Sequence, residues 1–255
     1  MTPKVVYDII APDKEAGLFY DFLGGGPGRW DVVFDRVYPE LRPMIASAKD
    51  RAEALDRCKT FAAALHAYNK EDMETARGTI QSAWDAVGPE FLRLLVDHFE
   101  TAWPDEHPTI VGHVSSLPVF PRFLDTFSFC LGYKDVSTLI EISAHEILHF
   151  LWFKKWAEVF PDMGPDTYQS PHLVWRLSEI MDPIILQCHP QIQRCIKPKK
   201  WGYSSFAQIT IGEVSMTEFF RDLYEKAMAS RASFEQVLRL LWGAAQQHEA
   251  EISAF

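Results

Sequence analysis

Two histidines and a glutamate lie within five consecutive residues, His145-Glu146-Ile147-Leu148-His149. On an α-helix, residues four apart project from the same face, so the imidazoles of His145 and His149 can bind one metal ion. Glu146 lies about 100° further round the helix, where its carboxylate can flank the ion and take a proton from a water molecule. Zinc suits such a site, because it binds imidazole nitrogen and lowers the pKa of a bound water to about 7.

A third protein ligand is needed, since catalytic zinc is usually held by three side chains. Glu179 is the best candidate, because Leu177, Ile180 and Met181 beside it are apolar, and a carboxylate in such a helix is costly to bury unless it is paired or binds a metal. Asp182 follows three residues later on the same face, where it can accept a hydrogen bond from the outer nitrogen of a ligating histidine. We therefore predict a zinc site of two histidines and one glutamate, with an aspartate behind it.

Other interpretations of these carboxylates stay open. Glu179 can pair with Arg176, three residues earlier on the same helix. Asp182 precedes a proline and can serve a turn alone. Glu141, four residues before the first histidine, is a rival ligand or a solvated carboxylate. The sequence alone does not decide among them.

The pattern resembles that of the gluzincin, or thermolysin-like, branch of the zincin metallopeptidases. The resemblance covers about residues 109–185 and rests on the His-Glu-x-x-His motif, on Glu179 one helix later and on Asp182 close behind it. It implies that both motif histidines and Glu179 bind zinc. It also implies that Glu146 is the general base and, later in the reaction, the proton shuttle.

The resemblance makes two further predictions. The strand just before the motif helix, near residues 126–131, would be an edge strand along which an extended peptide substrate pairs. A transition-state stabiliser, for which gluzincins use a downstream histidine or tyrosine, would be one of Tyr168, His172 and Tyr203, although His172 can equally cap its helix. The metzincin branch is excluded, because Trp152 and Lys155 stand where its longer motif requires glycine and histidine.

The motif and Glu179 must lie on neighbouring helices. Asp135, as an N-cap, predicts a helix over residues 136–160 that carries the motif. A loop over 161–170, rich in proline and glycine, lets the chain reverse. A second helix over 170–188 then carries Glu179 alongside the first.

The remaining sequence predicts mostly helices. From Trp30 to Trp103 apolar residues recur at helical spacing, which predicts three or four packed helices with a break at Gly88-Pro89. Strands are predicted over 109–116, 126–131 and 208–211, and further helices over 215–229 and 233–247. We therefore predict an α+β, mostly α fold. A zincin-like core with a small β-sheet would span 107–255, after an N-terminal helical region over 1–106, as separate domains or one continuous body.

Composition narrows the class of partner. Lys and Arg number 25 against 35 Asp and Glu, so the formal net charge is −10. That charge argues against nucleic acid and against an anionic membrane surface. No apolar run approaches the ~20 residues that span a bilayer, and residues 1–11 lack the apolar core of a signal peptide. We expect a cytoplasmic protein with a peptide or protein substrate.

The expected function is that of a zinc-dependent hydrolase, most simply a metallopeptidase. The alternative is a zincin-like protein without catalysis, which binds its metal for structure or presents its cleft to a partner. An open position on the metal favours the first, and a fourth protein ligand favours the second.

Three further residues suggest either a second metal site or buried thiols beside a histidine: Cys188, His189 and Cys195.

Overall fold

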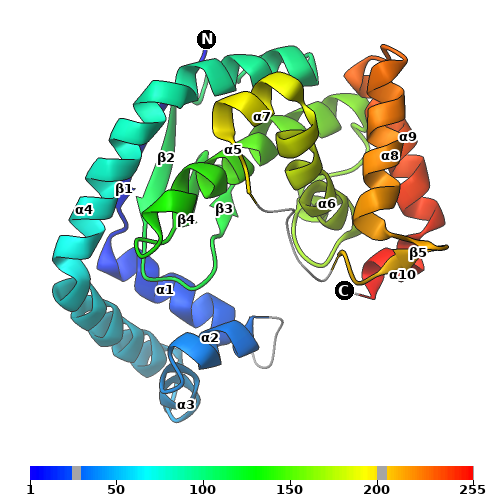
Figure 1. Cartoon of the computed structure of the whole chain (residues 1–255). Helices are drawn as coiled ribbons and strands as arrows, with labels where there is room; N and C mark the ends of the chain where they lie inside the picture. The colour runs from blue at the N-terminus through cyan, green and yellow to red at the C-terminus, as the bar shows by residue number, and fades with distance from the viewer. Residues whose placement is uncertain (25–29, 200–205, 255) are drawn as a thin grey trace. The chain divides into compact units, whose positions relative to one another are not determined.

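The computed structural model describes residues 1–24, 30–199 and 206–254 (Figure 1). Helices predominate and there is a small mixed sheet, so the prediction of an α+β, mostly α fold is confirmed at this level. The elements follow in the order β1 (Lys4–Ile9), α1 (Pro12–Leu23), α2 (Asp31–Val37), α3 (Leu41–Ala46), α4 (Arg51–Phe99), β2 (Thr109–Val114), β3 (Arg122–Phe123), β4 (Ser128–Leu131), α5 (Val136–Val159), η1 (Pro165–Tyr168), α6 (Leu173–Cys188), α7 (Pro190–Ile196), β5 (Thr210–Ile211), β6 (Val214–Ser215), α8 (Met216–Ala229), α9 (Phe234–Gln247) and α10 (Glu249–Ser253).

The chain forms two compact units. The sheet unit comprises Lys4–Ala86 and Thr109–Ile142. The motif unit comprises Met1–Pro3, Val87–Pro108 and Ser143–Phe255. Each unit therefore draws on residues before and after position 106, where the sequence suggested a boundary.

The sheet unit contains a four-stranded sheet of order β1-β2-β4-β3. β1 pairs with β2 in parallel, from Lys4 opposite Thr109 to Ile9 opposite Val114, and β2 pairs in parallel with β4. β1 was not predicted, because its residues lie in the region expected to be helical. Alternation of exposed Lys4 with buried Val5 and Tyr7 is the signal that could have revealed it.

The prediction that the strand near residues 126–131 is an edge strand is wrong. β4 lies between β2 and β3, and Arg122 and Phe123 of β3 pair antiparallel with Phe129 and Ser128. The N–H of Cys130 also donates to the carbonyl oxygen of a proline in the approach to β3. Both sides of β4 are thus occupied, because a two-residue strand, too short to predict from alternation, covers its outer side.

The core of the sheet unit lies where α1, α2, α3 and the first half of α4 pack together. Phe19 meets Phe34, Tyr38 and Phe61 edge to face, with ring centroids 5.6–6.2 Å apart. Glu15 of α1 is fully buried beside this core. Its carboxylate accepts a hydrogen bond from the N–H of Ser116 at 2.5 Å and contacts Nε2 of His66 at 2.7 Å, which ties three distant parts of the chain together.

α4 continues through Gly88-Pro89, so the predicted helix break is wrong. An internal proline costs a helix about 3 kcal/mol. Phe91, Leu92 and Leu95 follow it directly and are buried. Burying each such side chain contributes about 1.5–3 kcal/mol, so the apolar face after the proline outweighs its cost.

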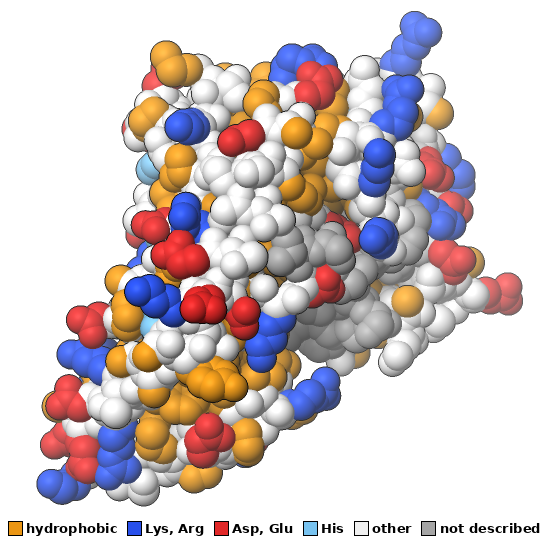
Figure 2. Space-filling view, turned by 60° about the vertical axis from the view of Figure 1, so that its left-hand side comes forward, with side chains coloured by type: hydrophobic (Ala, Val, Ile, Leu, Met, Phe, Trp, Pro, Cys, Tyr) orange, Lys and Arg blue, Asp and Glu red, His pale blue; other side chains and the backbone are white. Residues whose placement is uncertain are grey.

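Ion pairs also line α4. Arg57 pairs with Glu53, Arg77 with Glu74 and Arg93 with Glu90, each three or four residues apart. Figure 2 shows acidic and basic side chains interspersed in this way over one face of the molecule. Such exposed pairs contribute little because solvent screens them, so they support a long helix without determining where it packs.

The motif unit is built around α5 and α6, and both predicted helices are confirmed, although α6 begins at Leu173. Its core is aromatic: Phe99, Trp152 and Phe234 meet edge to face at 4.7–6.4 Å. The predicted capping box of α8 is also present, since the side chain of Ser215 accepts from the N–H of Glu218 while the Glu218 carboxylate accepts from the N–H of Ser215. The aromatic contacts join α5 to α9 and to the end of α4.

Candidate metal centre

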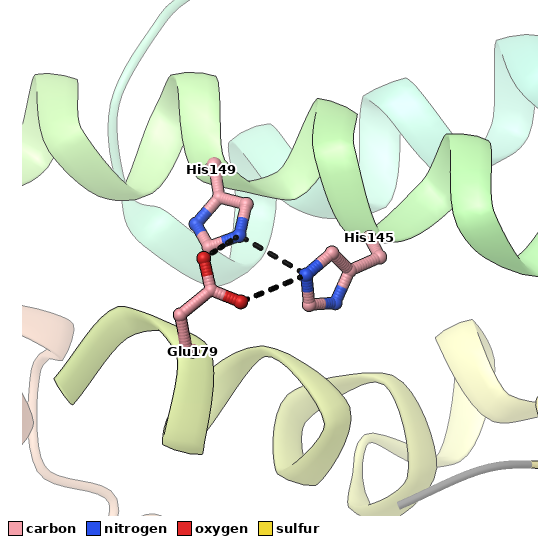
Figure 3. Close-up of side chains that lie close together, drawn as sticks. All are labelled: His145, His149 and Glu179. Atoms are coloured by element: carbon pink, nitrogen blue, oxygen red, sulfur yellow. Dashed lines mark hydrogen bonds and ion pairs between the residues drawn. The ribbon is translucent and has the colours of Figure 1, made fainter. Parts of the chain in front are cut away.

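The predicted ligands come together between α5 and α6 (Figure 3). His145 and His149 project from α5, and their Nε2 atoms lie 3.2 Å apart. Glu179 projects from α6, with one carboxylate oxygen 3.3 Å from Nε2 of His145 and the other 3.4 Å from Nε2 of His149. Among the described residues, this is the only group of three or more potential ligands whose atoms gather so closely.

The spacing of these atoms fits a zinc ion. Ligands held about 2.0–2.1 Å from zinc at tetrahedral angles lie about 3.3 Å from one another. The two imidazole nitrogens here are 3.2 Å apart, each lies 3.3–3.4 Å from a different oxygen of Glu179, and one atom from each of the three residues falls within 4.8 Å of the others. Two imidazoles and one carboxylate are also ligand types that zinc accepts. His149 is fully buried and Glu179 is 2% exposed, whereas the side chain of His145 is 22% exposed. The most accessible ligand is therefore His145.

Glu146 flanks the ligand set. It is 6% exposed, and its Oε1 lies 4.0 Å from Nε2 of His145. Its place one residue after a ligand turns it to the side of the group, as the helical geometry predicts. An ion held by the three ligands would therefore have a carboxylate next to it that need not bind it.

Asp182 lies behind His149. Its Oδ2 is 2.9 Å from Nδ1 of His149, and both side chains are fully buried. A carboxylate at this nitrogen favours the tautomer with the proton on Nδ1, which leaves the lone pair of Nε2 free for a metal. Asp182 thus lies where the sequence predicts it, one turn after Glu179 and facing the outer side of the histidine.

The side chains of the centre carry an excess of negative charge that a cation would balance. Three carboxylates, Glu146, Glu179 and Asp182, are buried around two imidazoles. Burial alone favours neutral His145, but its hydrogen bond to Glu179 and the three negative charges outweigh that effect and raise its pKa to about 9. Buried carboxylates are tolerated when they are paired or bind a metal. A divalent ion would supply the positive charge that the proton on His145 otherwise supplies.

Aromatic rings pack behind the ligands. The ring of Phe153 stacks on His149 at 5.8 Å and on Tyr168 at 4.7 Å. The sequence analysis missed Phe153, although its place four residues after His149 puts it on the ligand face of α5. The hydroxyl of Tyr168 donates to the carbonyl oxygen of Met163 at 3.3 Å. Tyr168 therefore supports the ligand helix through its ring.

The other two proposed transition-state stabilisers are not brought to the ligands. His172 is exposed and is the N-cap residue of α6, two turns before Glu179. Tyr203 lies outside the described residues. The described part of the chain thus places no predicted stabiliser against the ligand atoms.

Two alternatives from the sequence can now be compared with the contacts. The guanidinium of Arg176, the proposed partner of Glu179, donates to the carbonyl oxygens of Pro171 and Ile252, while the oxygens of Glu179 face the histidines. Within the described ranges, Glu141 belongs to no group of converging ligands, and neither do the three residues considered for a second metal site: Cys188, His189 and Cys195. The contacts favour Glu179 as the third ligand.

Comparisons with known proteins were negative: no protein-family model, curated protein or solved structure matches this chain. The described helices include none with the length and apolar character needed to cross a lipid bilayer.

Proposed function

We propose that this protein is a zinc-dependent hydrolase of the gluzincin type that cleaves peptide bonds. The observation that carries the proposal is the convergence of His145, His149 and Glu179, at separations of 3.2–3.4 Å, with Glu146 beside them. The order of these residues along the chain and their places on two neighbouring helices support the same assignment.

Zinc, when bound, would polarise a carbonyl group and lower the pKa of a water molecule to about 7. The residues of the chain would hold the ion, orient one of its ligands and move a proton. His145, His149 and Glu179 would hold the ion. Asp182 would fix the orientation of His149 through its 2.9 Å contact with Nδ1.

Glu146 would move the proton. It is a buried carboxylate next to a ligand nitrogen, so it can accept a proton from the attacking water and return that proton to the leaving amine. Burial keeps bulk water from competing for this carboxylate. Proton transfer by Glu146 needs no movement of α5, because its Oε1 already lies 4.0 Å from Nε2 of the ligand His145.

The test combines metal analysis with cleavage of a peptide library. The wild-type chain is expected to hold one zinc ion, and Glu146→Gln should keep that ion while its turnover falls by about 10²–10⁴-fold, the usual contribution of a general base. Glu158→Gln is the matched control, since it is the same substitution on the same helix at a side chain that is 40% exposed and paired with Lys154. A Glu146→Gln variant that cleaves as fast as the parent would refute the assigned role.

One observation favours the second function, a metal-binding protein without catalysis. His149 and Glu179 are almost fully enclosed, and only the His145 side chain reaches solvent to a useful extent. A structural zinc site has four protein ligands, whereas a catalytic one keeps a position open. Stoichiometric zinc together with no cleavage of any peptide, and a fourth protein ligand found by X-ray absorption, would establish this alternative.

A further inference from the structure

Arg176 lies on α6 one helical turn before Glu179, and it is 6% exposed. Its Nε donates to the carbonyl oxygen of Pro171 at 2.9 Å, and its Nη1 donates to the carbonyl oxygen of Ile252 at 3.2 Å. Pro171 belongs to the segment that leads into α6, and Ile252 belongs to α10. One buried cation thus joins three parts of the motif unit.

α10 is a firm anchor for this cation. Ile252 is fully buried, and its N–H donates to the carbonyl oxygen of His248. The ring of His248 meets Phe219 of α8 edge to face at 5.1 Å. The N–H of His248 in turn donates to Ala244 of α9. α10 is therefore fixed to two other helices before Arg176 fixes α6 to it.

A buried guanidinium needs its N–H groups satisfied, so the contacts of Arg176 hold α6 in one rotation and one axial position. Residues three apart are neighbours on a helix surface. Any rotation of α6 that breaks the contacts of Arg176 therefore also moves the carboxylate of Glu179. Zinc–ligand distances tolerate only about 0.2 Å, so a small rotation is enough to weaken binding.

We propose that Arg176 is a positioning residue for the zinc ligand Glu179, and that α10 acts on the metal centre through it. The inference rests on the part of the proposed function that concerns zinc binding, and it does not require hydrolysis. It assigns a role in the site to a helix that begins seventy residues after Glu179.

The first measurement is the zinc affinity of the full chain, by competition with a chelator, for Arg176→Gln and Arg176→Lys. Lysine keeps the charge but lacks the planar fork that donates in two directions. Loss of groups that orient metal ligands usually costs 10–100-fold in affinity, so we expect zinc to bind about tenfold or more weakly to both variants. Arg239→Gln is the control for the loss of an arginine, because Arg239 of α9 is half exposed and donates to the carbonyl oxygen of Val159 at 3.2 Å, at the end of α5 and ten residues after His149, so this bond reaches neither α6 nor α10.

The second measurement separates positioning from stability. A purely structural role would lower the unfolding temperature of the zinc-free variants and leave zinc affinity unchanged. Positioning predicts in addition that the visible absorption bands of the Co²⁺-loaded Arg176→Lys protein shift towards those of Co²⁺-loaded Glu179→Gln. Arg239→Gln should keep the wild-type bands.

The outcomes distinguish the two proposals. A wild-type chain that takes up no zinc refutes the metal centre itself. A wild-type chain that binds zinc, with equal affinity in both Arg176 variants, overturns the role of Arg176 and leaves the metal centre standing. If Arg176→Gln does not fold, Arg176→Lys alone decides, since unchanged affinity and unchanged Co²⁺ bands in that variant are enough to reject the inference.

Discussion

Replacing Asp182 by asparagine tests how much the zinc affinity depends on the carboxylate that contacts the outer nitrogen of His149. Asp182→Asn keeps nearly the same shape and can still offer an oxygen to Nδ1 of His149, 2.9 Å away. It removes one negative charge from a position that is fully buried. The ligand set itself, His145, His149 and Glu179, stays intact.

The expected effect follows from the negative charge that is lost beside Nδ1 of His149, which lies 2.9 Å from Oδ2 of Asp182. A polar interaction with a charged group contributes about 1.5–3 kcal/mol and one with a neutral group about 0.5–1.5 kcal/mol, so the substitution should cost about 1–1.5 kcal/mol of binding free energy. That loss corresponds to about tenfold in affinity. Because Asp182 and His149 are both fully buried, solvent screening should reduce the difference in zinc affinity between variant and wild type only slightly.

The assay is zinc competition at constant pH, with Asp166→Asn as the control. Asp166 lies in η1 of the same unit and is exposed, so its substitution should leave zinc affinity unchanged. Far-UV circular dichroism of the zinc-free proteins checks that each variant is folded. Equal zinc affinity in Asp182→Asn and wild type, within about twofold, would show that Asp182 does not orient His149.

Two further predictions concern stability. Removing zinc with a chelator should lower the unfolding temperature by about 8–16 °C. An ion at 1,000 times its dissociation constant stabilises the folded state by about 4 kcal/mol, and each kcal/mol shifts the unfolding temperature by about 2–4 °C for a chain of this size. Differential scanning calorimetry with and without zinc measures this shift, and an unchanged unfolding temperature would argue against zinc binding. Burial raises the pKa of Glu15 above its ordinary 4.5 in spite of its bonds to Ser116 and His66. Its contribution to stability is therefore fully present below pH 4.5 and is lost as the pH rises through the raised pKa. Glu15→Gln cannot titrate and should flatten this part of the pH dependence in urea unfolding experiments, whereas parallel pH curves for the variant and the wild type would contradict the assignment.

The grouping of His145, His149 and Glu179 was predictable because its signals are local. The four-residue spacing of His145 and His149 determines where their side chains point once a helix forms, and capping and proline signals placed that helix to within a residue or two. Glu179 was predicted as a ligand from its apolar neighbours, since a carboxylate on a buried helix needs a partner. The contacts then added Asp182 on the predicted side of His149.

The errors came from interactions between distant residues. The sequence near β4 gives no sign that Arg122 and Phe123 will cover its outer side, because a two-residue strand has no periodicity to detect. Pro89 predicts a helix break by its local chemistry, and only the burial of Phe91 and Leu92 overrides it. Arg176 was considered only as an alternative partner for Glu179 within its own helix, whereas its bond partners include Ile252, far along the chain.

The pairing of β1 with β2 has a consequence for how this chain is made. Lys4 lies opposite Thr109, so the partner of the first strand is synthesised about 105 residues later. At a translation rate of about 5–20 residues per second, Val5, Val6 and Tyr7 wait on the order of 5–20 s without a neighbouring strand. An apolar, β-prone stretch that stays unpaired for so long is an aggregation hazard. Pairing of β1 can therefore begin only after β2 has left the ribosome.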